Sequence, residues 1–405
     1  MMRLMKKTFR IAAAALLVAA APALHGAVTF SFNQHSTQNL FQTNDAVADQ
    51  VSAFTLSIDQ DSEALAFLAN VGYSAFHQTT GLSFLAAEAG FDYLHPSGEK
   101  SAFYFAAMGV GFFFGQDYAA FSSLGAHLVG AYKTYLAPSS IMKLQLQGWY
   151  SAYNDSLFDY ASTIASITLD KYFRSRTTLK ADAQYGYKYF LHPFLNEPLV
   201  SVAATAPVAS DASTFLAASN WGGNPYDSDR GFLPRFRPGG GGAGIGHVAV
   251  SVTAAQGLGD HIGLSASAAR QWIVSGENPF LSIEEFYLVQ NPSADAFSWD
   301  GHLLTGRITL VLPWAIEVKA AYTRSDKTYP GVELLDELQL PTGVMRNDAR
   351  DLFEARIRKN FRRFAIFAAF SYTDNDSNDP LFDWKGHAVM AGFDWALGSG
   401  GGNAP

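Results

Sequence analysis

Charged and amide side chains recur at every second position in several stretches of this sequence. Polar and apolar residues alternate within 142–152, and the alternation returns within 179–189 and 316–322. Side chains of a strand point alternately to its two faces, so each stretch predicts a strand with one polar and one apolar face. The positions predicted to line a polar wall are Lys143, Gln145, Gln147, Lys180, Asp182, Gln184, Lys188, Arg307, Glu317, Lys319, Glu354, Arg356, Arg358 and Lys385, with Glu88, Asp92 and His387 on the same face.

Both signs of charge occur on this polar face, and two interpretations follow. In the first, the charges set an ion preference, as rings of charge do in channels. The candidates for an electropositive strip are then Arg356, Arg358, Lys180, Lys319 and Lys385. In the second, the charges only solvate a wet wall or pair with one another. Near-balanced charge on the wall favours weak selectivity or ion pairs.

Other motifs that could bind a ligand or act in catalysis lack residues that a calcium, phosphate or hydrolase site requires. The run 374–379 is rich in Asp and Asn, but a calcium loop needs Gly at its sixth position and Glu at its twelfth, where Asp379 and Lys385 stand. The four glycines of 239–242 lack the Lys-Ser/Thr of a phosphate-binding loop. His77 and His302 are weak candidates for a hydrolase at the wall or mouth of a barrel. We therefore expect neither an enzyme nor a cofactor or metal site.

The N-terminus predicts export. Four basic residues precede an apolar run at 11–21, and small residues follow, so 1–27 is interpreted as a cleaved signal peptide, with an uncleaved anchor as the alternative. Removing these four basic residues, with no acidic ones, changes the formal charge from −8 to −12. Such a balance argues against nucleic acid as a partner. Cysteine is absent, which excludes disulfides and thiolate sites.

Sixteen segments of strand-like alternation follow, joined by connections that are alternately short and long. Transmembrane β-barrels have short periplasmic turns and longer external loops, so the sequence predicts an all-β, antiparallel up-and-down barrel over 28–397, with 14 to 18 strands allowed. A soluble all-β protein is the alternative. The predicted strands are 27–34, 51–59, 65–76, 82–94, 101–114, 121–136, 141–153, 161–173, 177–190, 245–256, 262–274, 298–312, 315–324, 351–361, 364–373 and 384–397.

The longest connection, 191–244, carries Arg230, Arg235 and Arg237. It is predicted either to fold inward as a constriction loop bearing these arginines or to lie over the mouth. Residues 398–405 are expected to form a short tail.

Aromatic residues gather near both ends of the predicted strands, as in the two aromatic girdles of membrane barrels. Those placed at the outer ends are Trp149, Tyr150, Tyr153, Tyr187, Tyr189, Trp272, Trp299, Tyr322, Tyr372 and Trp384. Ordinary core aromatics are the alternative interpretation.

The last strand, 385–397, resembles the C-terminal signal of outer-membrane barrels, with Gly392, Trp395 and Leu397 as its characteristic residues. It departs from that pattern at Met390, where a polar residue is usual, and the chain continues past the strand. The stretches 39–43 and 371–379 look like uncharacterised Gram-negative porin-type families. This resemblance implies a barrel in outer-membrane lipid, placed there by the barrel-assembly machinery.

The function expected from these features is passive diffusion of small hydrophilic solutes through an outer-membrane channel. The alternative is a scaffold that sheaths or docks another protein in export, electron transfer or surface assembly. The contact surfaces of a scaffold would be the connections 191–244, 275–297 and 325–350.

Overall fold

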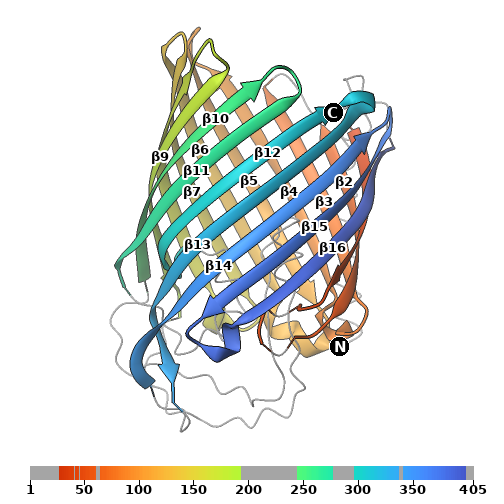
Figure 1. Cartoon of the computed structure of the whole chain (residues 1–405), viewed down its shortest axis with the longest axis vertical. Coiled ribbons are helices and arrows are strands. Elements are labelled where there is room, and N and C mark those ends of the chain that lie inside the picture. Colours follow the sequence, from red (N-terminus) through yellow and green to blue (C-terminus); the bar gives the residue numbers. More distant parts are fainter. Residues whose placement is uncertain are drawn as a thin grey trace.

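The chain forms a closed barrel of sixteen antiparallel strands in sequence order (Figure 1). This computed structural model describes residues 27–397 apart from 41, 45, 61–63, 193–243, 277–295 and 337–340. The strands are β1 Ala27–Thr37, β2 Asp49–Gln60, β3 Leu65–Phe76, β4 Phe84–Pro96, β5 Ser101–Phe114, β6 Ser123–Ala137, β7 Ser140–Tyr153, β8 Tyr160–Tyr172, β9 Thr177–Phe190, β10 Gly244–Leu258, β11 Ile262–Ser275, β12 Asp300–Leu312, β13 Ile316–Leu335, β14 Pro341–Asn360, β15 Phe364–Ser377 and β16 Trp384–Ala396. The predicted up-and-down barrel is confirmed.

The first and last strands close the sheet. Phe32 of β1 lies opposite Phe54 of β2 on one side and Phe393 of β16 on the other. Each strand therefore has two hydrogen-bonded neighbours, and the sheet has no free edge. Closure with all strands antiparallel and an even strand number brings Ala27 and Ala396 to the same rim.

The two rims differ in the connections they carry. At the rim that we call the turn rim, the upper end in Figure 1, two to four residues join consecutive strands, as in 138–139 and 313–315. The opposite rim, the loop rim, carries longer connections such as 38–48 and 115–122. The predicted alternation of connection length is present.

One predicted long connection is wrong. The segment 325–350 is mostly strand, because β13 continues to Leu335 and β14 begins at Pro341. The two strands stay paired past the end of their neighbours, with Lys327 opposite Asp348. Polar pairs hold this extension, so it lacks the apolar face from which strands were predicted.

Apolar side chains cover the outward face of the wall. Leu144 and Leu146 of β7 are exposed there, and Leu146 keeps 58% of its surface accessible. Their register partners on β8, Ile167 and Ala165, face the same way. The exposed apolar side chains include Phe54, Phe67, Tyr73, Phe105, Leu128, Leu169, Val250, Val252, Leu264, Leu304, Ile308, Ile357, Ile366 and Val389.

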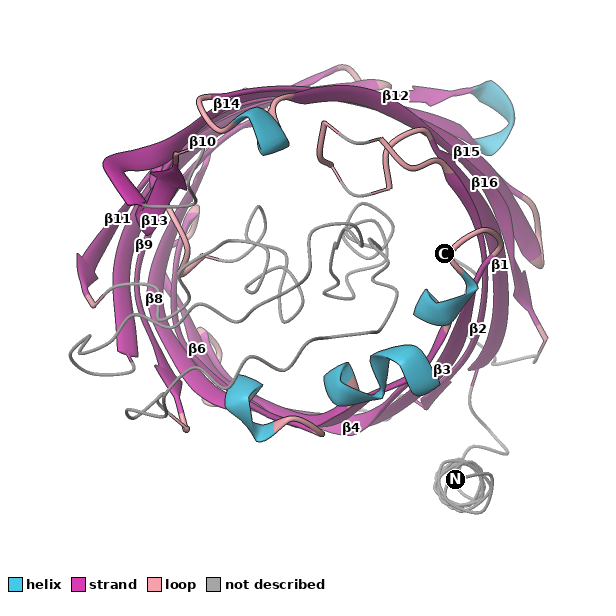
Figure 2. Cartoon of the chain, turned by 90° about the horizontal axis from the view of Figure 1, so that it is seen from below, coloured by secondary structure: helices cyan, strands magenta, loops and turns pink. Residues whose placement is uncertain are grey.

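Short 3-10 helices fold over the inner side of the loop rim, where Figure 2 shows them inside the ring. They are η2 Thr80–Leu82, η3 Gln116–Phe121, η4 Ser156–Phe158 and η6 Pro380–Phe382, and a further one, η5 Pro313–Ala315, lies at the turn rim. Their apolar side chains pack on the inward face of neighbouring strands. Leu82 and Tyr118 join one buried cluster with Phe84, and Phe158 joins another with Tyr160.

A polar side chain after each of three of these helices caps the strand before it. Ser83 Oγ accepts a hydrogen bond from the Phe76 backbone N–H at 3.0 Å, and Ser122 Oγ accepts one from Phe114 at 3.0 Å. An Asp159 carboxylate oxygen does the same for Tyr153 at 2.6 Å. We call this arrangement, a 3-10 helix followed by a Ser or Asp that caps the preceding strand, a loop-rim corner. It was not predicted from the sequence. Its signal is a Leu or Phe followed by Ser or Asp at the start of an even-numbered strand.

None of the helices in the described part of the chain is long and apolar enough to cross a membrane. Several sequence predictions lie outside the described residues. These are the signal peptide up to residue 26, the arginines Arg230, Arg235 and Arg237, and the tail 398–405.

Candidate functional site: the basic inner wall of β12–β14

Thirteen of the fourteen predicted wall positions face the interior of the barrel. The alternation fixes their direction, since Leu144 and Leu146 point outward and Lys143, Gln145 and Gln147 must therefore point inward. Register carries this assignment around the barrel, because directly opposed residues of neighbouring strands share a face. That these side chains line a pore stays a prediction.

Lys385 is the exception, and its predicted direction is wrong. On β16 the outward residues include Val389 and Trp395, which places Lys385 and His387 outside as well. The Lys385 ammonium donates to Asp374 of β15 at 2.9 Å. Polar residues occupy both faces near the loop rim, so polarity alone did not reveal the direction of the side chain there.

Three of the predicted outer-girdle tryptophans also point inward. Trp149 stacks on His127 with ring centroids 4.0 Å apart. Trp299 and Trp384 are buried at the loop rim. Cations lie over two of these indoles: Lys327 Nζ is 4.3 Å from the ring centroid of Trp299, and the Arg350 guanidinium is 5.8 Å from that of Trp384.

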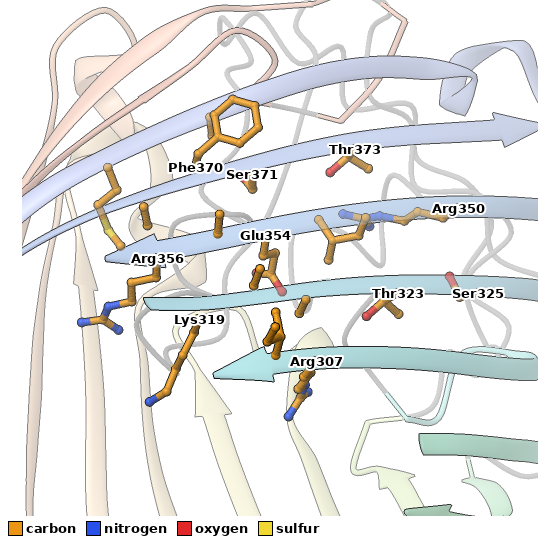
Figure 3. A pocket seen from close by; sticks show the side chains of 18 of the residues that line it. Arg307, Lys319, Thr323, Ser325, Arg350, Glu354, Arg356, Phe370, Ser371 and Thr373 are labelled. Carbon is orange, nitrogen blue, oxygen red and sulfur yellow. The ribbon is translucent and has the colours of Figure 1, made fainter. Parts of the chain in front are cut away.

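A cavity of about 800 Å³ lies against the inward face of β11–β16 (Figure 3). Its ionisable lining comes mainly from three neighbouring strands: Arg307 of β12, Lys319 and Lys327 of β13, and Arg350, Glu354 and Arg356 of β14. Five of these six groups are cationic. The cavity therefore has a strongly basic wall.

Register arranges the charges of this wall in successive rows. In one row, Arg307 and Glu354 lie on either side of Ala321. In the next row toward the turn rim, Lys319 lies directly opposite Arg356. In the row after that, Glu317 lies opposite Arg358. Because the rows follow one another along the wall, the cations lie at successive depths of the barrel toward the turn rim.

Ion pairs neutralise some of these cations. Lys319 Nζ lies 2.8 Å from Glu317, and Arg358 donates to Asp394 of β16 at 2.7 Å. Within the described part of the chain, Arg307 and Arg356 form no ion pair. The Arg356 guanidinium instead lies over the Phe367 ring, 4.7 Å from its centroid. These two guanidinium groups are where the wall keeps its positive charge.

The wall of β4 has the opposite character. Glu88 and Asp92 face inward there, and the Asn70 amide donates to Glu88 at 3.3 Å. Seen along the barrel axis, β4 lies across the ring from β12 and β14 (Figure 2). The interior thus has a basic side and an acidic side. Both groups of residues were predicted to face the interior, but their placement on opposite walls depends on the closed sheet.

Near the loop rim, Arg346 was missed by sequence analysis because it fell in the predicted connection 325–350. Its guanidinium lies between the rings of Tyr329 and Phe382, with centroids at 4.6 and 3.5 Å, and it donates to Asp348 at 2.9 Å. This buried pair fixes the extended β13–β14 hairpin to the helix η6.

The two histidines considered for hydrolysis lie outside the barrel near the loop rim. His302 Nε2 lies 3.0 Å from Asp326. His77 Nε2 lies 2.9 Å from the Ser52 hydroxyl, but in the described residues no acid bonds to its other ring nitrogen. No group of three or more His, Asp or Glu side chains suited to a metal ion occurs among the described residues.

The predicted assembly residues end the last strand. Gly392 faces inward, and a Cβ atom there would lie 2.4 Å from the Phe32 carbonyl oxygen and 2.7 Å from the Phe367 ring. Trp395 and Leu397 are exposed on the outward face. Recognition of these residues by an assembly machinery stays a prediction.

No protein-family model matches the chain, and no curated protein matches it. Solved structures that are similar in outline include one described as "Bacterial polysaccharide outer membrane secretin", at 8% identity and a TM-score of 0.46, covering 92% of this chain and 98% of that one. OpdO of Pseudomonas aeruginosa has 10% identity and a TM-score of 0.43, with coverage of 92% and 98%. OmpT of Vibrio cholerae has 10% identity and a TM-score of 0.41, with the same coverage. The function proposed below rests on the residues of this chain.

Proposed function

We propose that the barrel spans the bacterial outer membrane and works as a passive diffusion channel for small hydrophilic solutes. The observation that carries this proposal is the division of one closed wall into an apolar outward face and a charged inward face. A soluble barrel would need the reverse arrangement, with its apolar side chains inside. Hydrocarbon on the outside and water on the inside satisfy both faces of the wall.

The strand number supports a passage for solutes. Sixteen strands enclose more space than inward side chains fill, and barrels of this size leave an aqueous channel. The cavity against β11–β16 is lined by charged groups and by hydroxyl groups such as Thr323, Ser325 and Ser371. Such groups replace part of the hydration of a polar solute as it passes.

The test is conductance of the purified, folded chain in planar lipid bilayers. We expect discrete, ohmic current steps, and swelling of proteoliposomes in small sugars at a rate that falls with sugar size. A heat-unfolded sample of the same protein is the control and should give neither signal. A folded chain that inserts into lipid yet never opens an ion-permeable pore would overturn the proposal and favour the scaffold function.

A further inference from the structure

We propose that the inward face of β12–β14, the basic wall, binds small oxyanions and makes the channel prefer anions. The ligands carry a carboxylate or a phosphate group, and each of these groups has two or more oxygens that accept hydrogen bonds. This inference rests on the proposed channel function and names the solute class that the channel favours.

Positive charge is concentrated on the basic wall. Most inward-facing cations of the described barrel strands lie on these three neighbouring strands. They are Arg307, Lys319, Lys327, Arg346, Arg350, Arg356 and Arg358, against the three carboxylates Glu317, Asp348 and Glu354. A solvated wall without a ligand preference needs polar groups but no excess of one sign.

Lys319 and Arg356 form a pair of like charges on the basic wall. These cations lie directly opposite each other on β13 and β14. Like charges in that position destabilise a sheet, since their Cβ atoms lie only about 5 Å apart. Glu317 offsets the Lys319 charge at 2.8 Å, while no described carboxylate pairs with Arg356. An oxyanion held between the two side chains would remove the repulsion.

The type of side chain on the basic wall also favours oxyanions. Arginine presents a planar fork of N–H donors that matches two oxygens of a carboxylate or phosphate, whereas lysine acts as a point charge. Arg307 and Arg356 are both arginines, and Phe367 supports the flat face of the Arg356 guanidinium. Stacking on a ring leaves the N–H edge of the guanidinium for a ligand.

The cations of the basic wall lie at successive depths of the barrel. Lys327 and Arg350 lie nearer the loop rim, Arg307 follows, and Lys319 with Arg356 lies closer to the turn rim. Conduction needs sites that bind and release in sequence. A series of cations at successive depths provides such sites for an anion, and the carboxylates of Glu88 and Asp92 repel it from the opposite wall.

The inward face of β8–β9 is a useful contrast. Lys180 lies at a similar distance from the turn rim to Lys319, and both lysines pair with a carboxylate two residues away. Lys180, however, also lies directly opposite Asp170 of β8. Lys180→Gln therefore removes a cation from the interior at a place away from the basic wall, and it is the control for a general loss of positive charge.

The first experiment measures the reversal potential of the channel in a KCl gradient. The wild-type channel should prefer chloride over potassium. The double variant Arg307→Gln/Arg356→Gln should lower the chloride-to-potassium permeability ratio by roughly two- to fivefold, from the Coulomb energy of unit charges about 8 Å from the ion in water. Lys180→Gln should lower the ratio less, because the charge it removes lies away from the basic wall.

Three outcomes are informative. A conducting wild type that prefers potassium overturns this inference and leaves the channel function intact. An equal loss of chloride preference in Lys180→Gln also overturns it, because the effect would then be one of net charge. A folded chain without conductance defeats the channel function itself. Resistance of each variant to unfolding in unheated detergent shows that the barrel is intact.

The second experiment tests binding at the wall. Inorganic phosphate or succinate, added at millimolar concentrations to the KCl bath, should reduce the single-channel chloride current in a saturable way. The double variant Arg307→Gln/Arg356→Gln should lose most of this block, and Lys180→Gln should keep it. Block of equal strength in all three proteins, or no block in the wild type, would contradict the oxyanion site. Phosphate-only or succinate-only block identifies which oxyanion the wall accepts and supports the inference.

Discussion

Leu146 and Gln147 show that a shift of one position along a strand changes the face of the wall on which a side chain lies. They are neighbours in β7, but Leu146 is exposed on the outward face and Gln147 faces the interior. Their directions followed from the sequence because the alternation along β7 is unbroken. Where the alternation breaks down near the loop rim, as at Lys385, the same reasoning failed.

This difference gives a first prediction. Leu146→Arg should destabilise the folded barrel by about 2–4 kcal/mol if the residue lies near the bilayer midplane, whereas Gln147→Arg should cost far less. The measurement is the free energy of unfolding in lipid vesicles, from urea titration of tryptophan fluorescence. Similar losses for the two variants would contradict the proposed lipid-facing side.

Backbone strain at the turn rim gives a second prediction. Ala315, in the turn between β12 and β13, has a φ of 57°, which is in the left-handed region where a Cβ atom is unfavourable. Ala315→Gly should therefore raise the free energy of unfolding by roughly 0.5–1 kcal/mol, after the greater entropy of glycine in the unfolded chain is allowed for. Ala321→Gly, in regular strand, should lower it by about as much. Opposite signs for the two variants in the same urea titration are the expected result.

At the scale of elements, most strands could be predicted within a few residues of their observed ends. Each carries its own signal, an apolar face that alternates with a polar one, so no tertiary contact is needed to find it. β13 and β14 were predicted too short because their extension is held by polar contacts between the strands, such as the bond from the Thr328 hydroxyl to the Asn347 amide oxygen. The loop-rim corners were missed because their signal is only two or three residues long and spans a hairpin.

One of the loop-rim connections gives a third prediction. The buried Asp49 carboxylate accepts hydrogen bonds from the backbone N–H groups of His77, Gln78 and Thr79, at 2.9–3.1 Å. Asp49→Ala would leave the N–H groups of Gln78 and Thr79 without this acceptor, while the His77 N–H keeps its bond to the Gln50 carbonyl oxygen, and we expect a loss of about 2–5 kcal/mol in the free energy of unfolding. The connection 77–83 should also become sensitive to protease.

The control for this prediction lies on the same strand. Ser52 bonds to His77 through exposed side chains only, so Ser52→Ala should change the free energy of unfolding by less than about 0.5 kcal/mol. Limited proteolysis followed by mass mapping locates the cleavage. If Asp49→Ala resists protease as the wild type does, Asp49 does not hold this connection.

At the scale of the whole molecule, the basic wall could be predicted only in part. Arg307, Lys319 and Arg356 were each identified as polar-wall residues, because that requires only local alternation. That Lys319 lies opposite Arg356, and that Glu88 lies across the barrel, depends on the register of every strand between them. Strand register depends on how all the strands pair in the closed sheet, so the local alternation in a single sequence does not reveal it.

The contact between β1 and β16 gives a fourth prediction. A Cβ atom at Gly392 would lie far inside contact distance of the Phe32 carbonyl oxygen and the Asn33 side chain. Gly392→Val should therefore impair closure of the barrel and reduce the fraction of chains that fold in detergent micelles. Ala391→Val, one residue away on the outward face, should fold normally. Heat-dependent gel mobility, which separates closed from open chains, measures the difference.

The extended β13–β14 hairpin has a consequence for locating the chain in cells. Residues 329–335 and 341–347 continue past the last residues paired with β12 and β15, and seven residues of strand correspond to about 23 Å. A short epitope inserted between Leu335 and Pro341 would stand clear of the lipid surface. Antibody labelling of intact, unpermeabilised bacteria would then report directly which rim of the barrel meets the medium.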